Sequence, residues 1–350
     1  MTLRLKDLLS ASLRWLLGAL FVFSGAVKCV DPVGTSIYVE KYLATYGLDF
    51  MLSTSQVLGV VLAIVEFVLG VLLVVGILRR YASLTAFILL SIFTLITLLS
   101  ATLFPIGDCG CFGSVVMLGP WQTLIKNLIF LPIAWYVWHS SREKQTTTRW
   151  HIVVLTLAVL LPLGVSYYAS AHMPLVDVSP YREGIDLRSA VNEEREKIEA
   201  NTRSKLLFRD VATGDIVESD EWLDEGYEFI DAVVYVADVD ATYGDFMMYD
   251  SEGVDRSADI LRREGRVALL CVNDAEAVER CGRGLVRLRT AYPDGAIVIL
   301  TAAGDVDLLA GLTTYAVDAM MLRTMMRADV GVVILNDGVI EFKSNVRYIK

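Results

Sequence analysis

Two cysteines one residue apart are the most reactive feature of this sequence. Cys109 and Cys111 lie in the stretch Gly-Asp-Cys-Gly-Cys-Phe-Gly, residues 107–113, between two long apolar segments. A disulfide between positions i and i+2 closes a small ring, so the bond would be strained and easily reduced. The glycines would supply the backbone freedom that such a turn needs. The stretch therefore indicates a pair suited to thiol–disulfide exchange.

Two other interpretations of this pair stay open at the level of the sequence. The cysteines could be structural, either reduced in a tight loop or bridged, with one of them bonded to Cys29. A metal site is disfavoured, because two thiolates without a nearby histidine supply too few ligands. We therefore expect no metal.

Polar residues within the apolar segments are candidate binding residues. Glu66 lies in the middle of VLAIVEFVLG, where a carboxyl group is costly and must face the protein interior, either protonated or paired. It could instead join neighbouring helices by a hydrogen bond. Lys126 and Asn127 could stabilise a thiolate, pair with Glu66 or hold a polar headgroup, unless Lys126 simply extends to the membrane surface. Lys28 has the same options, with an ordinary interfacial lysine as the alternative.

The composition requires a membrane around part of the chain. Hydrophobic residues make up 55% of the 350 residues, and the mean hydropathy is +0.52, which is too apolar for an ordinary soluble protein. Segments long enough to cross about 30 Å of hydrocarbon occur at 8–28, 56–78, 81–105, 121–139 and 150–171. We expect a membrane all-α helical bundle of five transmembrane helices, in contact with the lipid bilayer.

Basic residues in the short connections predict the orientation. Arginine and lysine occur before the first segment, at Arg79-Arg80 and between residues 142 and 149, and such residues favour the cytoplasmic side. The loops 29–55 and 106–120 then lie outside, and five crossings place the C-terminal half outside as well. This pattern predicts a multi-pass membrane protein with a cytoplasmic N-terminus and a C-terminal domain on the outer side. Asp31-Pro32 predicts a short helix on the outer membrane surface.

Charge separates the two halves of the chain. Residues 1–179 hold 11 Lys/Arg and 8 Asp/Glu, whereas residues 180–350 hold 20 and 33. The acidic half offers no basic stripe to neutralise phosphates, which argues against nucleic-acid binding. Residues 181–203 are charged and helical in pattern, as in a spacer or a solvated helix.

The C-terminal half has the pattern of an α/β domain. Short β-branched runs, typical of buried strands, occur at 232–237, 266–272, 296–302 and 330–336. Helical segments are expected at 254–264, 274–291 and 316–327, and Asp337-Gly338 predicts a hairpin. From residue 266 onward, this is the element order of a soluble α/β thioredoxin-like domain. The predicted units are residues 1–140, 141–178, 179–205 and 206–350.

The predicted outer domain lacks its own reactive pair. Asn273-Asp274-Ala275-Glu276 occupies the position where a redox thioredoxin fold carries C-x-x-C, and it contains no thiol. Cys271 is expected to be a buried strand residue, and Cys281 a helix residue that either reaches it or does not.

The chain resembles the DoxX/MauE family of membrane proteins in several short motifs and in their order. They are Phe23-Ser24-Gly25-x-x-Lys28, Asp31-Pro32-x-Gly34, Glu66 with Gly70, Cys109 to Gly113, and Trp121-Gln122-Thr123 with Lys126-Asn127. The C-terminal tail, most clearly residues 322–340, is similar to a Gram-negative subgroup with an added helix and an outer domain. Valine at position 330, where that subgroup has proline, argues against a catalytic outer domain.

The resemblance implies a four-helix core in a bacterial inner membrane, with the C-terminal domain in the periplasm. It also implies a link to disulfide formation or to thiol oxidation coupled to a membrane quinone. The first hypothesis is thus a thiol–disulfide oxidoreductase that uses Cys109 and Cys111, with a quinone near Glu66 and Lys126. The second is a non-catalytic scaffold or assembly factor whose acidic outer domain binds a periplasmic or envelope protein. A homo-oligomer fits either hypothesis, and a transporter with Glu66 on a proton path is a weaker third.

Overall fold

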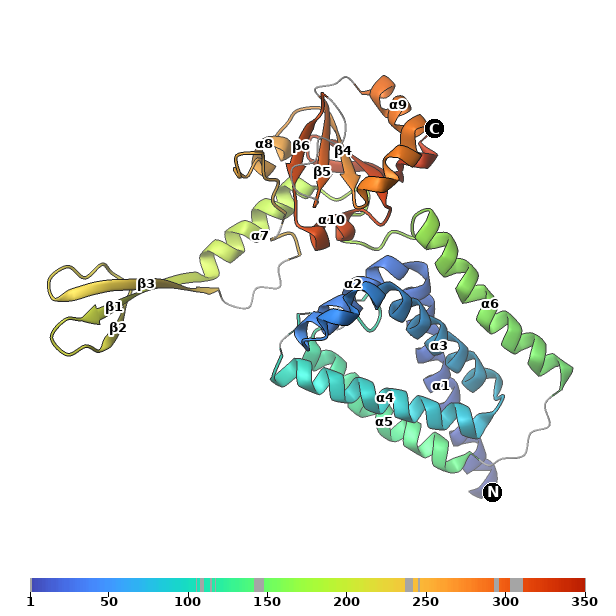
Figure 1. Cartoon of the computed structure of the whole chain (residues 1–350). Coiled ribbons are helices and arrows are strands. Elements are labelled where there is room, and N and C mark those ends of the chain that lie inside the picture. Colours follow the sequence, from blue (N-terminus) through green and yellow to red (C-terminus); the bar gives the residue numbers. More distant parts are fainter. Residues whose placement is uncertain are drawn as a thin grey trace.

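The computed structural model (Figure 1) describes residues 2–104, 106–107, 110–113, 115–116, 118–141, 148–236, 242–244, 246–292, 296–302 and 311–349. The first six helices gather in one part of the molecule, and an α/β domain lies beyond one end of them. A three-stranded sheet projects sideways from the α/β domain. The predicted fold class is confirmed as a helical membrane region followed by an α/β domain.

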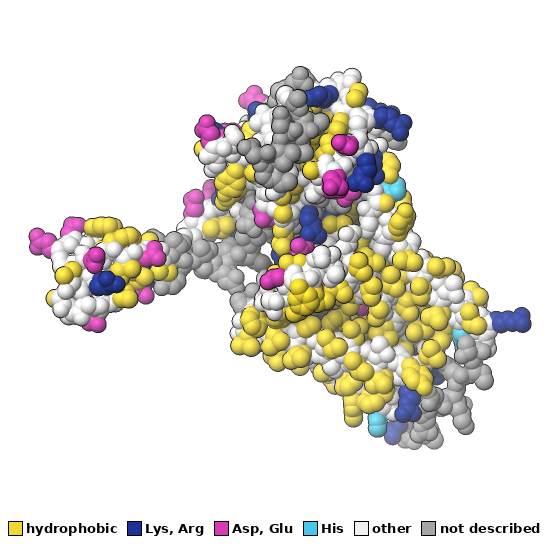
Figure 2. All heavy atoms as spheres, in the orientation of Figure 1, with side chains coloured by type: hydrophobic (Ala, Val, Ile, Leu, Met, Phe, Trp, Pro, Cys, Tyr) yellow, Lys and Arg dark blue, Asp and Glu magenta, His cyan; other side chains and the backbone are white. Residues whose placement is uncertain are grey.

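The described part of the membrane region contains five long helices. They are α1 (Thr2–Val30), α3 (Ser55–Val75), α4 (Arg79–Thr102), α5 (Pro120–Ser140) and α6 (Arg149–Ala171). By length and composition, the part of the chain that the structure describes has four helices that could cross a membrane: α1, α3, α4 and α6. Helix α5 is not among them, but it packs against α4 (Figure 1). The surface of the bundle in Figure 2 is largely hydrophobic, as contact with lipid requires.

Arg14 and Arg79, from two of the basic stretches, lie beside Gly76 at one end of the bundle. The Arg14 guanidinium on α1 donates a hydrogen bond to the carbonyl of Leu73, near the end of α3. The Oγ atoms of Ser10 and Ser140 lie 2.8 Å apart and join the first turns of α1 to the last turn of α5. The α/β domain lies at the opposite end (Figure 1). This agrees with the distribution expected from the basic residues, whereas the cytoplasmic and periplasmic assignments stay predictions.

Glycines allow α1 and α3 to cross closely. A Cβ atom on Gly25 would lie 2.4 Å from the backbone nitrogen of Phe67, and one on Gly70 would lie 2.4 Å from that of Val22. Backbone atoms cannot move aside as a flexible side chain can. Small residues at such crossings are a common basis of helix association in membranes, so these two glycines hold Lys28 and Glu66 at short range.

We expect Gly25→Ala to lower the free energy of unfolding by about 1–3 kcal/mol through overpacking. Chemical or thermal unfolding of the purified chain in detergent measures the change. Gly164→Ala on α6 is the matched control, because nothing lies within 4 Å of its added Cβ, and alanine favours a helix by about 1 kcal/mol. Equal stability of the two variants would contradict the close α1–α3 crossing.

The predicted interfacial helix forms as α2 (Pro32–Thr45), followed by the 3₁₀ helix η1 (Asp49–Thr54). The Asp31 side chain caps α2 by accepting a 2.8 Å hydrogen bond from the backbone N–H of Gly34, and Pro32 fills the first helical position, where no N–H is needed. Helix α2 packs between α3 and the α/β domain, and its position at the membrane surface stays a prediction.

The main sheet of the α/β domain has the strand order β6-β5-β4-β7-β8. Its strands are β4 (Arg266–Val272), β5 (Ile297–Thr301), β6 (Thr313–Ala316), β7 (Val330–Asn336) and β8 (Val339–Asn345). Strand β5 is parallel to β4 and β6, whereas β7 is antiparallel to β4 and β8. Asp337 and Gly338 have φ values of 51° and 86°, as the predicted β7–β8 hairpin requires. Strand β6 was not predicted, since its four residues have no apolar run.

Helices cover both faces of this sheet. They are α7 (Leu187–Asn201), α8 (Ser257–Leu261), η2 (Ala275–Ala277), η3 (Glu279–Cys281), α9 (Gly282–Ala291), α10 (Ala319–Met325) and η5 (Val346–Tyr348). Cys271 belongs to the core on one face and Cys281 to the core on the other, and both are free thiols. Burial raises the pKa of Cys271 to about 12, so this thiol stays protonated and unreactive at neutral pH. The two cysteines therefore do not form a pair.

The projecting sheet and helix α7 differ in part from what the sequence predicted. Its strands β1 (Thr202–Asp210), β2 (Ile216–Ser219) and β3 (Tyr227–Val236) pair in the antiparallel order β2-β1-β3. The run at 232–237 was expected to be a buried strand, but Ala232 in β3 is exposed and β3 lies outside the main sheet. A β-branched run specifies a strand without specifying its partners. The stretch expected to be a spacer or a solvated helix contains α7, and its Leu187 and Val191 are buried in the domain core.

Candidate functional site

A buried ion pair between Lys28 and Glu66 forms the centre of the candidate site. Lys28 is 5% exposed near the end of α1, and Glu66 is 1% exposed in the middle of α3. The lysine Nζ lies 2.7 Å from Glu66 Oε2. The partner of Glu66 is thus Lys28, and the interpretation of Lys28 as an ordinary interfacial lysine is wrong. Each charge compensates the other where water cannot solvate them.

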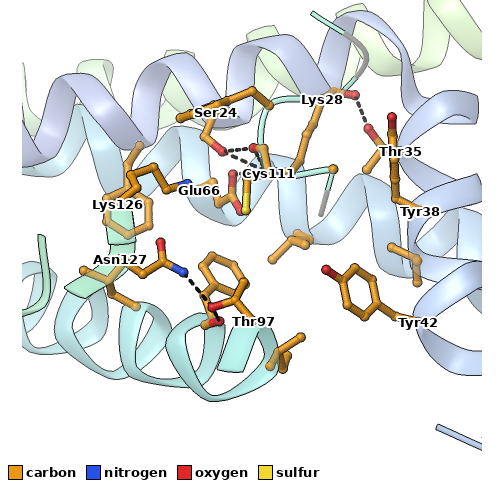
Figure 3. Close-up of a pocket in the computed structure, with 18 of the residues that line it drawn as sticks. Ser24, Lys28, Thr35, Tyr38, Tyr42, Glu66, Thr97, Cys111, Lys126 and Asn127 are labelled. Carbon is orange, nitrogen blue, oxygen red and sulfur yellow. Dashed lines mark hydrogen bonds and ion pairs between the residues drawn. The ribbon is translucent and has the colours of Figure 1, made fainter. Parts of the chain in front are cut away.

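The same ammonium group holds the cysteine loop. Lys28 Nζ donates to the carbonyl oxygen of Cys111 at 2.8 Å and to Ser24 Oγ at 2.7 Å. Ser24 lies one turn before Lys28 on α1, and its hydroxyl also donates to the Cys111 carbonyl, at 2.7 Å. Two donors from α1 therefore fix the backbone at Cys111 (Figure 3).

The loop itself is shaped by glycine, as the sequence predicted. Gly110 and Gly113 have φ values of +60° and +54°, a region that residues with a side chain rarely adopt. A Cβ on Gly110 would lie 2.4 Å from the ring of Tyr38 on α2. Cys111 carries a free thiol, and so does buried Cys29, so a Cys29–Cys111 bridge is absent. Cys109 lies outside the described residues, and its pairing stays a prediction.

The ion pair and the loop line an apolar cavity of about 220 Å³. Its walls come from α1 to α5 and from the loop (Figure 3). Polar or reactive residues on the wall are Ser24, Lys28, Thr35, Tyr38, Tyr42, Glu66, Thr97, Cys111, Lys126 and Asn127. Glu66 Oε1 is buried and has no hydrogen-bond partner among the described residues. A buried carboxylate oxygen without a donor is costly, and this one is available to a ligand.

Lys126 and Asn127 reach the same cavity from α5. The Lys126 ammonium lies 4.5 Å from the centre of the Phe112 ring, in a cation–π contact beside the cysteine loop. Asn127 is 1% exposed, and its Nδ2 donates to Thr97 Oγ1 on α4 at 3.2 Å. The structure therefore brings Lys28, Glu66, Lys126, Asn127 and Cys111 together around one cavity. Among the described residues, Lys126 forms no ion pair with Glu66, whose partner is Lys28.

Helix α2, which forms one wall of the cavity, and Asp31 before it form ion pairs with the outer domain. The sequence alone did not reveal this contact. Arg327, just after α10, forms an ion pair with Asp31 at 3.2 Å, and their side chains are only 2% and 7% exposed. One turn earlier, Arg323 Nη1 lies 2.6 Å from Glu40 Oε2 on α2. Asp31 stood out only as a helix cap, and nothing local in the sequence connects it to Arg327.

The helices, the cavity and the added domain together define a multi-pass membrane protein with an α/β domain docked over a polar centre between its helices. Residues 6–139 match the model of the family described as methylamine utilisation protein MauE, which supports the MauE part of the predicted resemblance. The chain is also 26% identical over 158 residues to "Protein TlpB" of Flavobacterium psychrophilum. That similarity covers 43% of this chain and 42% of the relative, so the chain spans less than half of the relative's length. No solved structure has significant similarity to the chain.

Proposed function

We propose that the chain is a membrane thiol–disulfide oxidoreductase module that uses Cys109 and Cys111 and passes electrons to a membrane quinone. The observation that carries this proposal is the position of Cys111. It lines an apolar cavity between membrane helices, and the same cavity contains the Lys28–Glu66 pair and Lys126. An apolar cavity with a few convergent polar groups is typical of a small-molecule site.

The reaction would consist of two balanced two-electron steps. In the first, the Cys109–Cys111 disulfide accepts two electrons from a client dithiol, which leaves as a disulfide while both cysteines become thiols. In the second, the two thiols return to the disulfide and a quinone takes up two electrons and two protons. Glu66 Oε1 has no partner among the described residues, so it is suited to accept a hydrogen bond from the resulting hydroxyl group. The fixed carbonyl of Cys111 would keep the thiol at the cavity.

The outer domain fits this proposal as a covering domain. The strand order β5-β4-β7-β8, with β4 and β5 parallel and β7 antiparallel, supports the thioredoxin-like interpretation. At the end of β4, the backbone N–H groups of Asn273 and Asp274 donate to the carbonyl of Asp329, two residues from Arg327. Residues 273–276, where a redox thioredoxin fold carries C-x-x-C, are therefore close to the contact with α2. These four residues contain no thiol.

We expect Cys111→Ala to reduce electron transfer from a reduced dithiol peptide to a short-chain quinone to the background rate, because no second thiol would be left to close the disulfide. Quinone absorbance with the full chain in nanodiscs measures the rate. Cys281→Ala removes a buried thiol outside the cavity and serves as the matched control. Unchanged turnover in Cys111→Ala would reject the redox function.

A scaffold function is the second candidate, and the projecting sheet favours it. Residues 202–236 hold nine Asp/Glu and three Lys/Arg. The side chains of Val211, Ile216 and Trp222 are each at least 60% exposed, and Figure 2 shows hydrophobic and acidic side chains together on this sheet. Such a surface suits an envelope protein with a basic, partly apolar face. If Cys109→Ala/Cys111→Ala complements a deletion strain fully and removal of residues 205–233 does not, the scaffold function holds instead.

A further inference from the structure

A second cavity, separate from the one at Cys111, lies where α6 meets the α/β domain. Its volume is about 650 Å³. Its lining includes Tyr168, His172, Arg182, Glu183, Lys343 and Tyr348. Tyr168 and His172 stand at the end of α6, where a membrane helix leaves the hydrocarbon and reaches the lipid headgroups. The cavity is therefore at headgroup level.

On the buried side of this cavity, the charged groups of Lys343 and Asp177 pair with each other. Lys343 Nζ lies 2.6 Å from Asp177 Oδ2 and 3.3 Å from Ser179 Oγ, and the lysine side chain is 2% exposed. Burial lowers the pKa of Lys343, and the Asp177 carboxylate opposes that change. This pair shapes the cavity but offers no free charge to a ligand.

One wall is a stack of three aromatic rings. The ring of His172 lies between those of Tyr168 and Tyr348, with centroid distances of 4.4 and 4.7 Å. Asn345 Nδ2 donates a hydrogen bond to the carbonyl oxygen of His172, at 3.3 Å. Aromatic rings that are about half exposed, as Tyr168 and Tyr348 are, favour the boundary between lipid and water and attract cations to their faces.

Two neighbouring lining residues leave opposite charges unpaired. Among the described residues, the Arg182 guanidinium makes no ion pair and no hydrogen bond, and Glu183 makes no ion pair. Glu183 Oε1 accepts only the backbone N–H of Lys343, at 3.1 Å. The cavity thus presents one free guanidinium and one carboxylate with free acceptor capacity, a complement to a ligand that carries both an anion and a cation.

We propose that this cavity binds the phosphoethanolamine headgroup of a membrane phospholipid. Arg182 pairs with the phosphate, since guanidinium groups match phosphate oxygens well. Glu183 accepts hydrogen bonds from the ammonium group beside the tyrosine faces. A choline headgroup has no N–H to donate, and a glycerol headgroup has no cation, so both bind more weakly. The site at the end of α6 draws its ligand from the bilayer.

Native mass spectrometry of the full chain in detergent, titrated with phosphatidylethanolamine, phosphatidylcholine or phosphatidylglycerol, tests this. We expect phosphatidylethanolamine to bind most tightly, and Arg182→Gln/Glu183→Gln to weaken that binding by about tenfold or more through the loss of two charge-assisted contacts. Arg209→Gln/Glu228→Gln removes an exposed pair on the projecting sheet and should leave it unchanged. Both double variants replace exposed side chains, and their melting temperatures verify that they fold.

Three outcomes would overturn the proposal. Equal binding of the three lipids would exclude headgroup recognition. Tighter binding of phosphatidylglycerol would indicate a site for an anionic group only. Soluble phosphoethanolamine that binds as tightly as the lipid would show that the ligand comes from solution and not from the bilayer. Because none of these readouts involves Cys109 or Cys111, the result is independent of the proposed redox function.

Discussion

Glu66→Gln is expected to lower the free energy of unfolding by about 3–5 kcal/mol, because it leaves the Lys28 ammonium buried without a counter-charge. In the wild-type chain this ammonium lies 2.7 Å from Glu66 Oε2 and also holds the Cys111 carbonyl. Loss of the carboxylate removes the group that fixes the Lys28 ammonium in place. The cysteine loop, which this ammonium holds, should therefore loosen as well. Thermal unfolding in detergent measures the first effect. The rate of maleimide labelling at Cys111, with the other four cysteines replaced by alanine, measures the second.

Two control variants separate stability from positioning. Lys28→Met/Glu66→Met removes both charges, so we expect most of the stability to return, while labelling at Cys111 stays fast because its carbonyl has lost the lysine donor. Ser91→Ala removes a hydroxyl on α4 that donates only within its own helix, to the carbonyl of Phe87 at 2.7 Å. It should change neither readout. If Glu66→Gln is as stable as Ser91→Ala, the buried pair is not a structural centre of the membrane region.

Arg327→Leu is expected to detach the outer domain from α2. It removes the partner of Asp31 from an ion pair whose side chains are 2% and 7% exposed, and an uncompensated buried carboxylate costs about 3–5 kcal/mol. The connection between α6 and α7 should then become accessible to protease, and backbone amides in α2 should exchange faster. Limited proteolysis and hydrogen exchange of the full chain measure both changes.

Arg323, which also contacts α2, provides a matched control one turn before Arg327. The Arg323–Glu40 pair is 2.6 Å long, but its side chains are 32% and 24% exposed, and partly solvated pairs contribute about 1 kcal/mol or less. Arg323→Leu should therefore have a much smaller effect than Arg327→Leu. A double-mutant cycle with Asp31→Asn should assign the coupling energy to Arg327 and Asp31. Equal effects of the two arginine variants would contradict a specific buried contact.

Much of the fold follows from local patterns in the sequence. Runs of apolar residues specify membrane helices because every backbone group must be paired inside lipid, and the observed α1, α3, α4 and α6 agree with the predicted segments. The hairpin at Asp337-Gly338 and the helix that starts after Asp31 depend on one or two residues with special backbone preferences. The projecting sheet was missed because strand partners are not encoded in the strand itself.

The candidate site was only partly predictable, for a related reason. Glu66 and Lys126 stand out because charges within apolar segments are costly. Lys28 was underrated because it lies near the end of its helix, where a lysine commonly reaches water. Only the close α1–α3 crossing, which Gly25 and Gly70 allow, places its ammonium against Glu66 and the Cys111 carbonyl.

The sequence by itself determined that this protein has a helical membrane region and an α/β domain, and that the loop after the third apolar segment carries two thiols between glycines. These properties depend on composition and on residues close together in the chain. The tertiary structure decided which charges pair, what encloses the cavity at Cys111 and how the outer domain covers it. Those contacts join residues as distant as Asp31 and Arg327, and distant pairs meet only when whole elements pack.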